Sequence, residues 1–243
     1  MGQSLDKSGV SCYTLAAPSL MRHFIPRFLS AALAAGALLA GACSPPKYAS
    51  YKSPQGDFKL EVPWGWLVMN EAEGTRFTNA NFIGGFEPDF FLGAPSFSVR
   101  WHSYYDPRKL PGGRLEMFSS VDDYIKQMLA DVYAPRYFLA TDIQEVPLKK
   151  AKKQGKMFVV QSPAPIAPNS QFGVVYSSRT GEGFNLRKHA YVILPMTRGF
   201  YVMIYPATRD GFPKFEKQFI HLIESFLPLT DGPGGAGFSA KAR

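Results

Sequence analysis

One residue of the sequence, Cys43, has a type and a setting that point to a specific chemical modification. It follows an uncharged stretch of fifteen residues, 28–42, that is rich in Ala and Leu, and a short basic segment beginning at Met21 lies before that stretch. Such a stretch is short for a bilayer span but is typical of the apolar core of a signal peptide. Small residues stand directly before the cysteine, as a peptidase with a narrow cleft requires. We therefore expect residues 1–42 to be a signal peptide region.

The segment Leu39-Ala40-Gly41-Ala42-Cys43 resembles the bacterial lipobox. The resemblance implies that diacylglycerol is attached to the Cys43 thiol, that cleavage falls between Ala42 and Cys43, and that the new amine is usually acylated as well. Ala40 departs from the leucine favoured at the third position before the cysteine, and Leu39 stands one place earlier. The alternative is an ordinary signal peptide that is cleaved in the same segment and leaves a free thiol.

Acylation of Cys43 predicts a peripheral membrane protein. One acyl chain binds a membrane only marginally, whereas two or more hold firmly. No later stretch of the sequence approaches the roughly twenty apolar residues of a membrane-spanning helix. We expect a lipid anchor in the cell membrane, with the protein facing the periplasm or the exterior. Ser44 follows the cysteine, so resemblance to the usual sorting rule implies the outer membrane in a bacterium that has two.

Residues 1–20 do not fit a signal peptide, because the acidic Asp6 lies ahead of the basic start. We expect translation to begin at Met21, in which case Cys12 is not part of the protein; a tolerated N-terminal extension is the alternative. The chain beyond Cys43 contains no cysteine, so it can hold no internal disulfide and no thiolate metal site.

Three histidines follow the cysteine: His102, His189 and His221. None has a second histidine or a carboxylate at metal-ligand spacing, so we expect scattered structural or surface histidines, no metal and no cofactor. A hydrolase using His102 or His189 needs a nucleophile or a carboxylate within hydrogen-bond reach. The sequence has neither a Gly-x-Ser-x-Gly motif nor a phosphate-binding glycine loop. We expect no catalytic residues and no enzyme, and a hydrolase is the least favoured alternative.

The basic charge of the chain is most concentrated in one short loop. The formal net charge of +8 is otherwise spread along the sequence, which is weak evidence for an anionic partner, and we expect no nucleic acid to bind an exported lipoprotein. Four residues of this lysine loop are candidate contacts for anionic headgroups or an acidic partner: Lys149, Lys150, Lys152 and Lys153. The alternative is a solvated hairpin tip that protects a sheet edge from aggregation.

An aromatic segment that is dense in glycine and proline is the second candidate surface. Its central residues are Phe86, Phe90 and Phe91. Exposed together, they would form a surface for a partner or a ligand, because soluble proteins rarely expose large apolar patches without a function. The alternative is that they belong to the buried core.

The elements that position these residues follow from the periodicity of apolar side chains. Alternating and short apolar stretches predict strands over 58–62, 66–69, 76–78, 96–102, 143–148, 157–161, 172–176, 190–194 and 200–205. Helical spacing predicts a helix over 121–133 capped by Ser120, and a final helix that Asp210 caps and Pro228 stops. This order of strands, helix, antiparallel strands and helix predicts an α+β domain.

The order of landmarks is similar to that of the PsbP-like (Mog1/PsbP) family. The landmarks are Tyr51, Gly56-Asp57-Phe58, Val62-Pro63 and Trp66 at the start, a Ser120-capped helix with Asp123-Tyr124, the hairpin Ala190-Tyr191-Val192 to Gly199-Phe200-Tyr201, and the helix from Phe215 to Phe226. The resemblance covers most of 51–229 and implies an α/β/α sandwich with a central antiparallel sheet flanked by helices. The family includes accessory proteins of membrane complexes and binding modules without a common catalytic reaction, so no catalytic residues transfer.

Together these observations divide the chain into a signal peptide region (1–42), a lipidated tether (43–50), a PsbP-like domain (51–229) and a flexible tail (230–243). The expected function is that of a membrane-anchored envelope lipoprotein with a non-enzymatic accessory role, which binds an envelope protein partner whose identity the sequence does not give. The alternative is a module that binds a small ligand, with the aromatic segment as one wall of its pocket. A closed cavity favours this alternative, and a fully packed interior excludes it.

Overall fold

The computed structural model of the protein describes residues 47–71, 74–80, 94–110, 112–133, 138–164, 174–176 and 183–234. These residues form antiparallel sheets and two helices, which agrees with the predicted α+β class. The strands are β1 (Tyr48–Lys52), β2 (Phe58–Pro63), β3 (Trp66–Glu71), β4 (Gly74–Asn79), β5 (Ser96–Ser103), β6 (Arg108–Lys109), β7 (Leu115–Glu116), β8 (Phe138–Leu148), β9 (Lys153–Ala164), β10 (Val174–Tyr176), β11 (Gly183–Pro195), β12 (Gly199–Thr208) and β13 (Leu227–Pro228). The helices are α2 (Val121–Met128), continued by a π-helical turn η2 (Leu129–Tyr133), and α3 (Phe212–Ser225).

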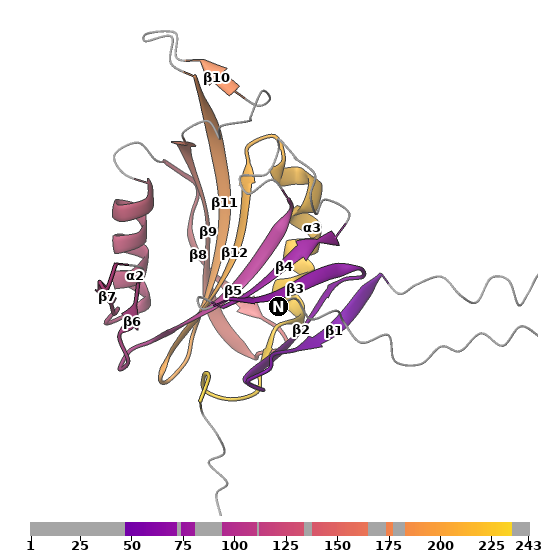
Figure 1. The fold of residues 1–243 in the computed structure, drawn as a ribbon, viewed down its shortest axis with the longest axis vertical. Helices are drawn as coiled ribbons and strands as arrows, with labels where there is room; N and C mark the ends of the chain where they lie inside the picture. Colours follow the sequence, from indigo (N-terminus) through magenta and orange to yellow (C-terminus); the bar gives the residue numbers. More distant parts are fainter. Residues whose placement is uncertain are drawn as a thin grey trace, which may run out of the picture. The chain divides into compact units, whose positions relative to one another are not determined.

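The main sheet has the strand order β3-β4-β5-β12-β11-β9-β8, and β10 pairs with β11 (Figure 1). Every pair of neighbours is antiparallel. The two predicted hairpins, β8–β9 and β11–β12, are confirmed. Strand β5, the clearest alternating stretch of the sequence, lies between β4 and β12 and therefore in the interior of the sheet.

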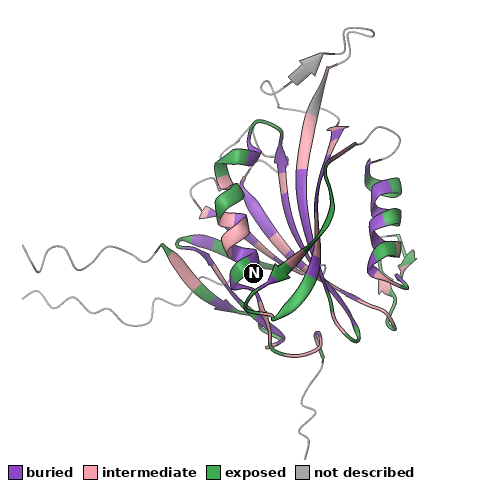
Figure 2. Ribbon diagram, turned by 180° about the vertical axis from the view of Figure 1, so that it is seen from behind, coloured by how far each residue is buried: buried purple, intermediate pink, exposed green. Residues whose placement is uncertain are grey.

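Alternate residues of β12 pack against different helices. Phe200, Val202 and Ile204 belong to a buried cluster with residues of α2. Tyr205, the residue directly after Ile204, instead contacts Phe212 and Phe219 of α3, with ring centroids 5.0 and 5.7 Å apart. Successive side chains of a strand point to opposite faces, so Tyr205 lies on the other face of β12 from Phe200, Val202 and Ile204. In Figure 2 the ribbons of both helices carry purple, buried residues as well as green, exposed ones.

Helix α2 begins where the sequence predicts. The Ser120 side chain accepts a hydrogen bond from the Asp123 amide at 3.0 Å, which satisfies one of the free N–H groups of the first turn. The predicted helix over 121–133 is continuous, but its last five residues form the π-helical turn that ends at the buried Tyr133. This wider turn determines where Tyr133 meets the sheet.

Helix α3 begins one residue later than the predicted cap. Gly211 is its N-cap and makes no side-chain capping bond, and the predicted cap, Asp210, pairs with Arg209 at 2.8 Å instead. The Gly211 amide donates to the Thr208 hydroxyl at 3.1 Å. Pro213 lies in the first turn, where the missing N–H is tolerated. Thr208, at the end of β12, thus contacts the start of α3 in place of Asp210.

A second, small sheet joins β1, β2 and β13. Strand β1 was not predicted; it begins at Tyr48, inside the segment taken as the tether, and pairs with β2. At the other end of the domain, the amides of Leu229 and Thr230 donate to the Asp57 carbonyl at 2.7 and 3.2 Å. Described structure therefore extends a few residues beyond each predicted domain boundary, and the lipidated tether and the flexible tail stay predictions.

Candidate functional site

A pocket of about 530 Å³ lies beside α2, between the helix, the main sheet and the β6–β7 hairpin. Its floor is formed by alternate residues of β5, which are Ser96, Ser98, Arg100 and His102. The intervening residues point to the other face, where Phe97 packs against Phe219 of α3. A strand in the interior of a sheet therefore presents a polar face to an enclosed space.

Arginines from five positions line this pocket, which we call the arginine pocket. They are Arg76 on β4, Arg100 on β5, Arg108 on β6, Arg114 in the turn before β7, and Arg187 on β11. The acidic residues in the lining are Glu116 and Asp131. Cationic side chains therefore outnumber anionic ones, and a partly enclosed space strengthens their attraction for an anion compared with open water.

One end of the arginine pocket contains buried polar atoms without hydrogen-bond partners among the described residues. These are the Nε and Nη1 atoms of Arg108 and the Nε2 atom of His102. The remaining Arg108 nitrogen, Nη2, lies 2.9 Å from Glu116 Oε2. Unsatisfied buried groups cost free energy and are rare in native proteins. An acceptor supplied by a bound anion would satisfy the arginine donors.

His102 is held tightly at this end. Its side chain is 5% exposed and its ring stacks on Phe200, with centroids 5.2 Å apart. Gly199 lies opposite, where an added Cβ would fall 2.1 Å from the His102 carbonyl oxygen, so the close approach of β12 requires glycine. Burial, followed by the charges of Arg108 and Arg100, lowers the pKa of His102 to about 3. The imidazole is therefore neutral at physiological pH.

A hydrogen-bond network forms the other end of the arginine pocket. The Tyr133 hydroxyl shares hydrogen bonds with His189 Nδ1 at 2.7 Å and with the Tyr191 hydroxyl at 2.5 Å. Arg187 lies over the Tyr133 ring at 4.9 Å and donates to the Ser162 hydroxyl at 3.0 Å. Burial raises the pKa of both tyrosines and lowers that of His189 to about 3. These groups stay uncharged beside the guanidinium.

The contacts of both buried histidines disfavour the hydrolase alternative. His102 Nδ1 is 3.9 Å from Glu116 Oε2, which is beyond hydrogen-bond distance. His189 bonds to Tyr133, whose hydroxyl is a poor nucleophile because burial raises its pKa. We expected scattered structural or surface histidines. His102 and His189 are instead both buried and line the same pocket.

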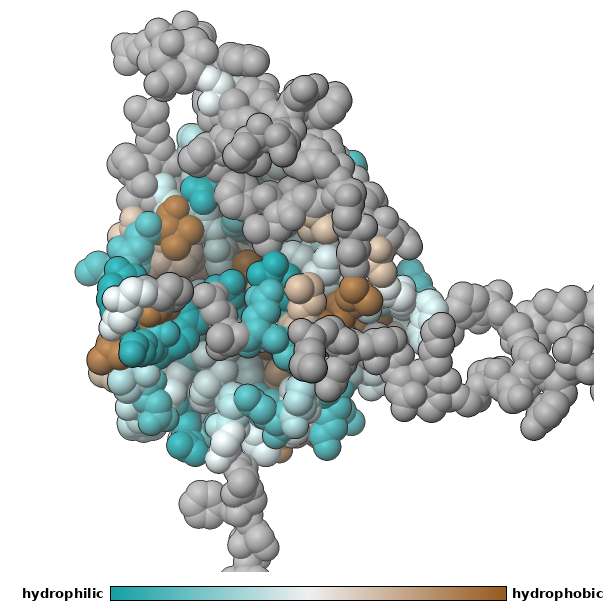
Figure 3. Space-filling model, viewed as in Figure 1, coloured by the Kyte–Doolittle hydropathy of each residue, from teal (hydrophilic) through white to brown (hydrophobic). Residues whose placement is uncertain are grey.

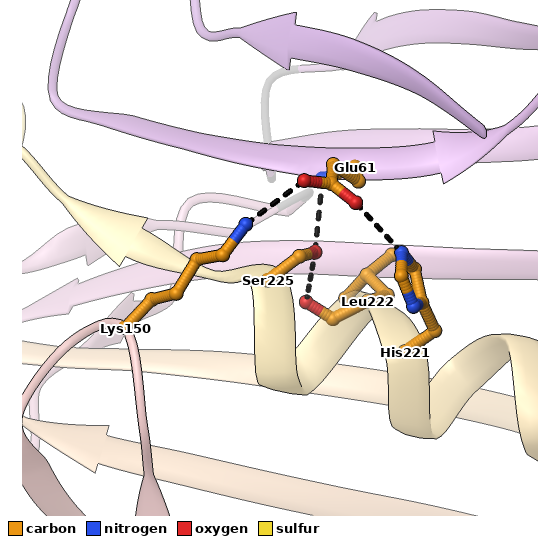
Figure 4. Close-up of polar contacts among 5 residues, drawn as sticks. All are labelled: Glu61, Lys150, His221, Leu222 and Ser225. Atoms are coloured by element: carbon orange, nitrogen blue, oxygen red, sulfur yellow. Dashed lines mark hydrogen bonds and ion pairs between the residues drawn. The ribbon is translucent and has the colours of Figure 1, made fainter.

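The third histidine, His221, belongs to a separate polar cluster on α3 (Figure 4). Its Nε2 atom lies 2.8 Å from Glu61 Oε2, and Lys150 donates to Glu61 Oε1 at 2.8 Å. The Ser225 hydroxyl accepts from the Glu61 amide and donates to the Leu222 carbonyl, each at 2.9 Å. The hydrogen bond from Lys150 and then that from His221 lower the pKa of Glu61. Because its hydroxyl is bonded to the backbone, Ser225 joins β2 to α3.

The lysine loop lies in the turn between β8 and β9. Two of its residues make ion pairs, Lys149 with Glu224 at 3.1 Å and Lys150 with Glu61 at 2.8 Å. Lys152 has a positive φ of 53° at the tip, and Lys153 begins β9. Contact with an anionic surface stays a prediction for this loop. Cys43 and the aromatic candidates Phe86, Phe90 and Phe91 lie outside the described residues.

Within the described part of the chain, no group of three or more His, Cys, Asp or Glu residues is placed to hold a metal ion. No helix in that part is both long and apolar enough to cross a membrane.

Comparison with solved structures gives likenesses to this fold. No protein-family model matches the sequence, and no curated protein does. The fold is similar to the solution structure of cyanobacterial PsbP (CyanoP) from Synechocystis sp. PCC 6803, with a TM-score of 0.45 and 10% sequence identity. The likeness covers 76% of this chain and 95% of that one.

Proposed function

We propose that the protein is a lipid-anchored, non-enzymatic envelope protein that binds a small anionic ligand in the arginine pocket. The anchor part rests on the signal-like segment and the lipobox resemblance at Cys43. The lipid anchor also implies a location, which is the outer membrane if the bacterium has two membranes. The binding part rests on the arginine pocket, and the observation that carries it is that the buried Nε and Nη1 atoms of Arg108 have no hydrogen-bond partner within the described part of the chain.

An anion fits these atoms for electrostatic and geometric reasons. The planar guanidinium presents paired N–H groups that match the two oxygens of a carboxylate or a phosphate. Arg100 on β5 lines the same pocket, and the neutral His102 adds a further polar nitrogen without adding charge. Hydrogen bonds to charged groups contribute about 1.5–3 kcal/mol each.

A small ligand is favoured over a protein partner by the enclosure of the site. The pocket volume of about 530 Å³ lies in the range of about 300–1,000 Å³ that is typical for small-molecule sites. The sequence favoured a protein partner over a small ligand, and the pocket reverses this preference. The accessory role with a protein partner is the second candidate, supported by the exposed Leu115 and Met117 on the β6–β7 hairpin. A pull-down from solubilised membranes tests it.

We further propose that the domain is an α/β/α sandwich, with the main sheet between α2 and α3. The opposite orientation of neighbouring side chains on β12 supports this arrangement. In it, the arginine pocket lies in the layer between the sheet and α2, on the side of the helix toward β5 and β4.

The binding proposal is tested by calorimetry with acetate, inorganic phosphate and citrate. The protein is the mature chain carrying Cys43→Ser, so that neither acyl chains nor detergent compete. We expect saturable binding of at least one anion. Arg108→Lys, which keeps the charge but loses the paired N–H donors of the guanidinium, should weaken binding about tenfold or more. Arg100→Gln should weaken it to a similar extent. The matched control is Arg198→Gln, an exposed arginine outside the pocket. Absence of binding, or equal binding by all variants, would overturn the proposal.

A further inference from the structure

We infer that the ligand of the arginine pocket is a single-chain amphiphile, with a carboxylate or phosphate head and one apolar chain. This inference rests on the proposed function and adds the class of the ligand. It starts from the distribution of side chains in the pocket, which is polar at its floor and apolar at its rim. A ligand with a charged end and an apolar end matches this order.

The apolar rim comes from two separate elements. Leu115 on β7, Met117 just after it and Val132 in η2 all line the pocket, yet 63, 54 and 49% of their surfaces are exposed. Exposed apolar surface costs roughly 25 cal/mol per Å² compared with burial. Figure 3 shows brown, hydrophobic side chains among teal ones over α2, β6 and β7. An alkyl chain leaving the pocket between the hairpin and η2 would cover these three side chains.

An apolar wall connects the rim to the polar floor. Tyr124 and Met128 are one helical turn apart on α2 and face the pocket, and Phe118 and Ile204 lie in the same buried cluster. This wall runs past the end where polar atoms of Arg108 and His102 have no partner among the residues that the structure describes. The head group therefore sits deep against Arg108 and Arg100, and the chain lies along α2 toward solvent.

The size of the pocket favours one chain. Its volume of about 530 Å³ lies within the range of about 300–1,000 Å³ that is typical of sites for small molecules, which suits a head group with a single chain. An anchored protein at a membrane surface lies next to the source of such molecules.

The test is calorimetry below the micelle concentration with the mature Cys43→Ser chain. The probes are laurate and dodecyl phosphate, with shorter homologues of each, and acetate, inorganic phosphate, dodecanol and a tetraglutamate peptide as comparisons. We expect affinity to rise about two- to fourfold for each added methylene until the chain reaches the rim. Whichever of the two long probes binds more tightly identifies the head group.

Two variants separate the head site from the rim. Leu115→Ser combined with Met117→Ser should weaken laurate and dodecyl phosphate tenfold or more and leave acetate and phosphate unchanged, whereas Arg108→Lys should weaken all four. Ile143→Ser, which removes an exposed apolar side chain from β8 outside the pocket, is the matched control. Circular dichroism and thermal melts verify that each variant is folded.

The two proposals fail in different ways. If the short anions bind but chain length has no effect, the amphiphile inference is wrong and the proposed function stands. If dodecanol binds as tightly as laurate, the inference is also overturned. If tetraglutamate binds more tightly than laurate, it is overturned in favour of an acidic protein segment as the ligand. If none of the anions binds, both proposals fail.

Discussion

Tyr133 and His189 are 56 positions apart in the sequence, yet the Tyr133 hydroxyl lies 2.7 Å from His189 Nδ1 in the buried interior. The π-helical turn after α2 carries Tyr133 down to the sheet, and β11 carries His189 up to meet it. The same hydroxyl also bonds to Tyr191. This junction closes one end of the arginine pocket and attaches the end of the helix to the middle of the sheet.

Replacing Tyr133 by phenylalanine should destabilise the protein by about 1–3 kcal/mol, because two buried polar groups would each lose a partner. The aromatic volume stays, so packing changes little. Urea unfolding followed by circular dichroism measures the free energy of unfolding. Tyr105→Phe is the control, since its side chain is exposed, and should change stability by less than about 0.5 kcal/mol. Equal effects of the two substitutions would show that the junction contributes nothing.

Stability should fall on mild acidification because His102 and His189 are buried in neutral form. Both have a pKa of about 3 in the folded protein, against about 6.5 when unfolded. The unfolded chain therefore binds more protons below pH 6.5. The contribution of each histidine is complete above that pH and is lost as pH falls toward 3. The slope is at most about 1.4 kcal/mol per pH unit for each residue.

Denaturant midpoints at pH 7.5, 6.5 and 5.5 check this expectation, in a range above the titration of most carboxylates. His102→Gln should be less stable at pH 7.5 but should show a shallower pH dependence than the original protein. His221→Gln is the comparison, because His221 is part-buried beside Glu61. A pH profile that His102→Gln leaves unchanged would mean that this imidazole is not held neutral.

The parts of the fold that the sequence predicts are those determined locally. The Ser120 cap, the alternation in β5 and the two long hairpins depend on neighbouring residues, and all three are present. Strand β1 was missed because its residues follow a proline-rich stretch and carry little apolar periodicity. It becomes a strand through pairing with β2, where Tyr51 lies opposite Leu60, and only the fold reveals this partner.

Glu61→Gln should cost less than about 1 kcal/mol, although Glu61 bonds to both Lys150 and His221. Its side chain is more than a third exposed, and exposed ion pairs contribute little because water and salt screen them. The lowered pKa of Glu61 means that its contribution is present above the unfolded pKa and is lost as pH falls through the folded one. Urea unfolding at low and high salt tests this. Glu224→Gln, which breaks the more exposed pair with Lys149, should have a smaller effect still.

The mature protein should carry lipid on Cys43. Mass spectrometry of protein extracted from membranes should find an acylated N-terminal Cys43 and no residues before it. Cys43→Ser should move the protein out of the membrane fraction, because no acyl chain can be attached. Ser44→Ala leaves the cysteine in place and serves as the control for membrane attachment. An unmodified thiol in a soluble protein would contradict the anchor.

The arginine pocket could not be predicted in the same way as the strands. Ser96, Ser98 and Arg100 form the polar half of an alternating strand, and such a pattern normally marks a face exposed to water. Here the β6–β7 hairpin and α2 enclose that face. The hairpin strands are two residues long, too short to give a periodic signal. A lone histidine at the end of this polar row, His102, is the one local sign that the face differs from an ordinary surface.

If Cys43 carries lipid as proposed, the early start of β1 limits how far the domain can move from the membrane. Tyr48 stacks on His221 with ring centroids 3.7 Å apart, so the chain is fixed to the domain from that residue onward. With lipid on Cys43, the five residues 43–47 precede β1, and at about 3.3–3.6 Å per residue they span at most about 18 Å. The domain would then sample a thin shell above the bilayer. Molecules leaving the headgroup layer would meet it at a high effective concentration, and targets deeper in the envelope would have to approach the membrane.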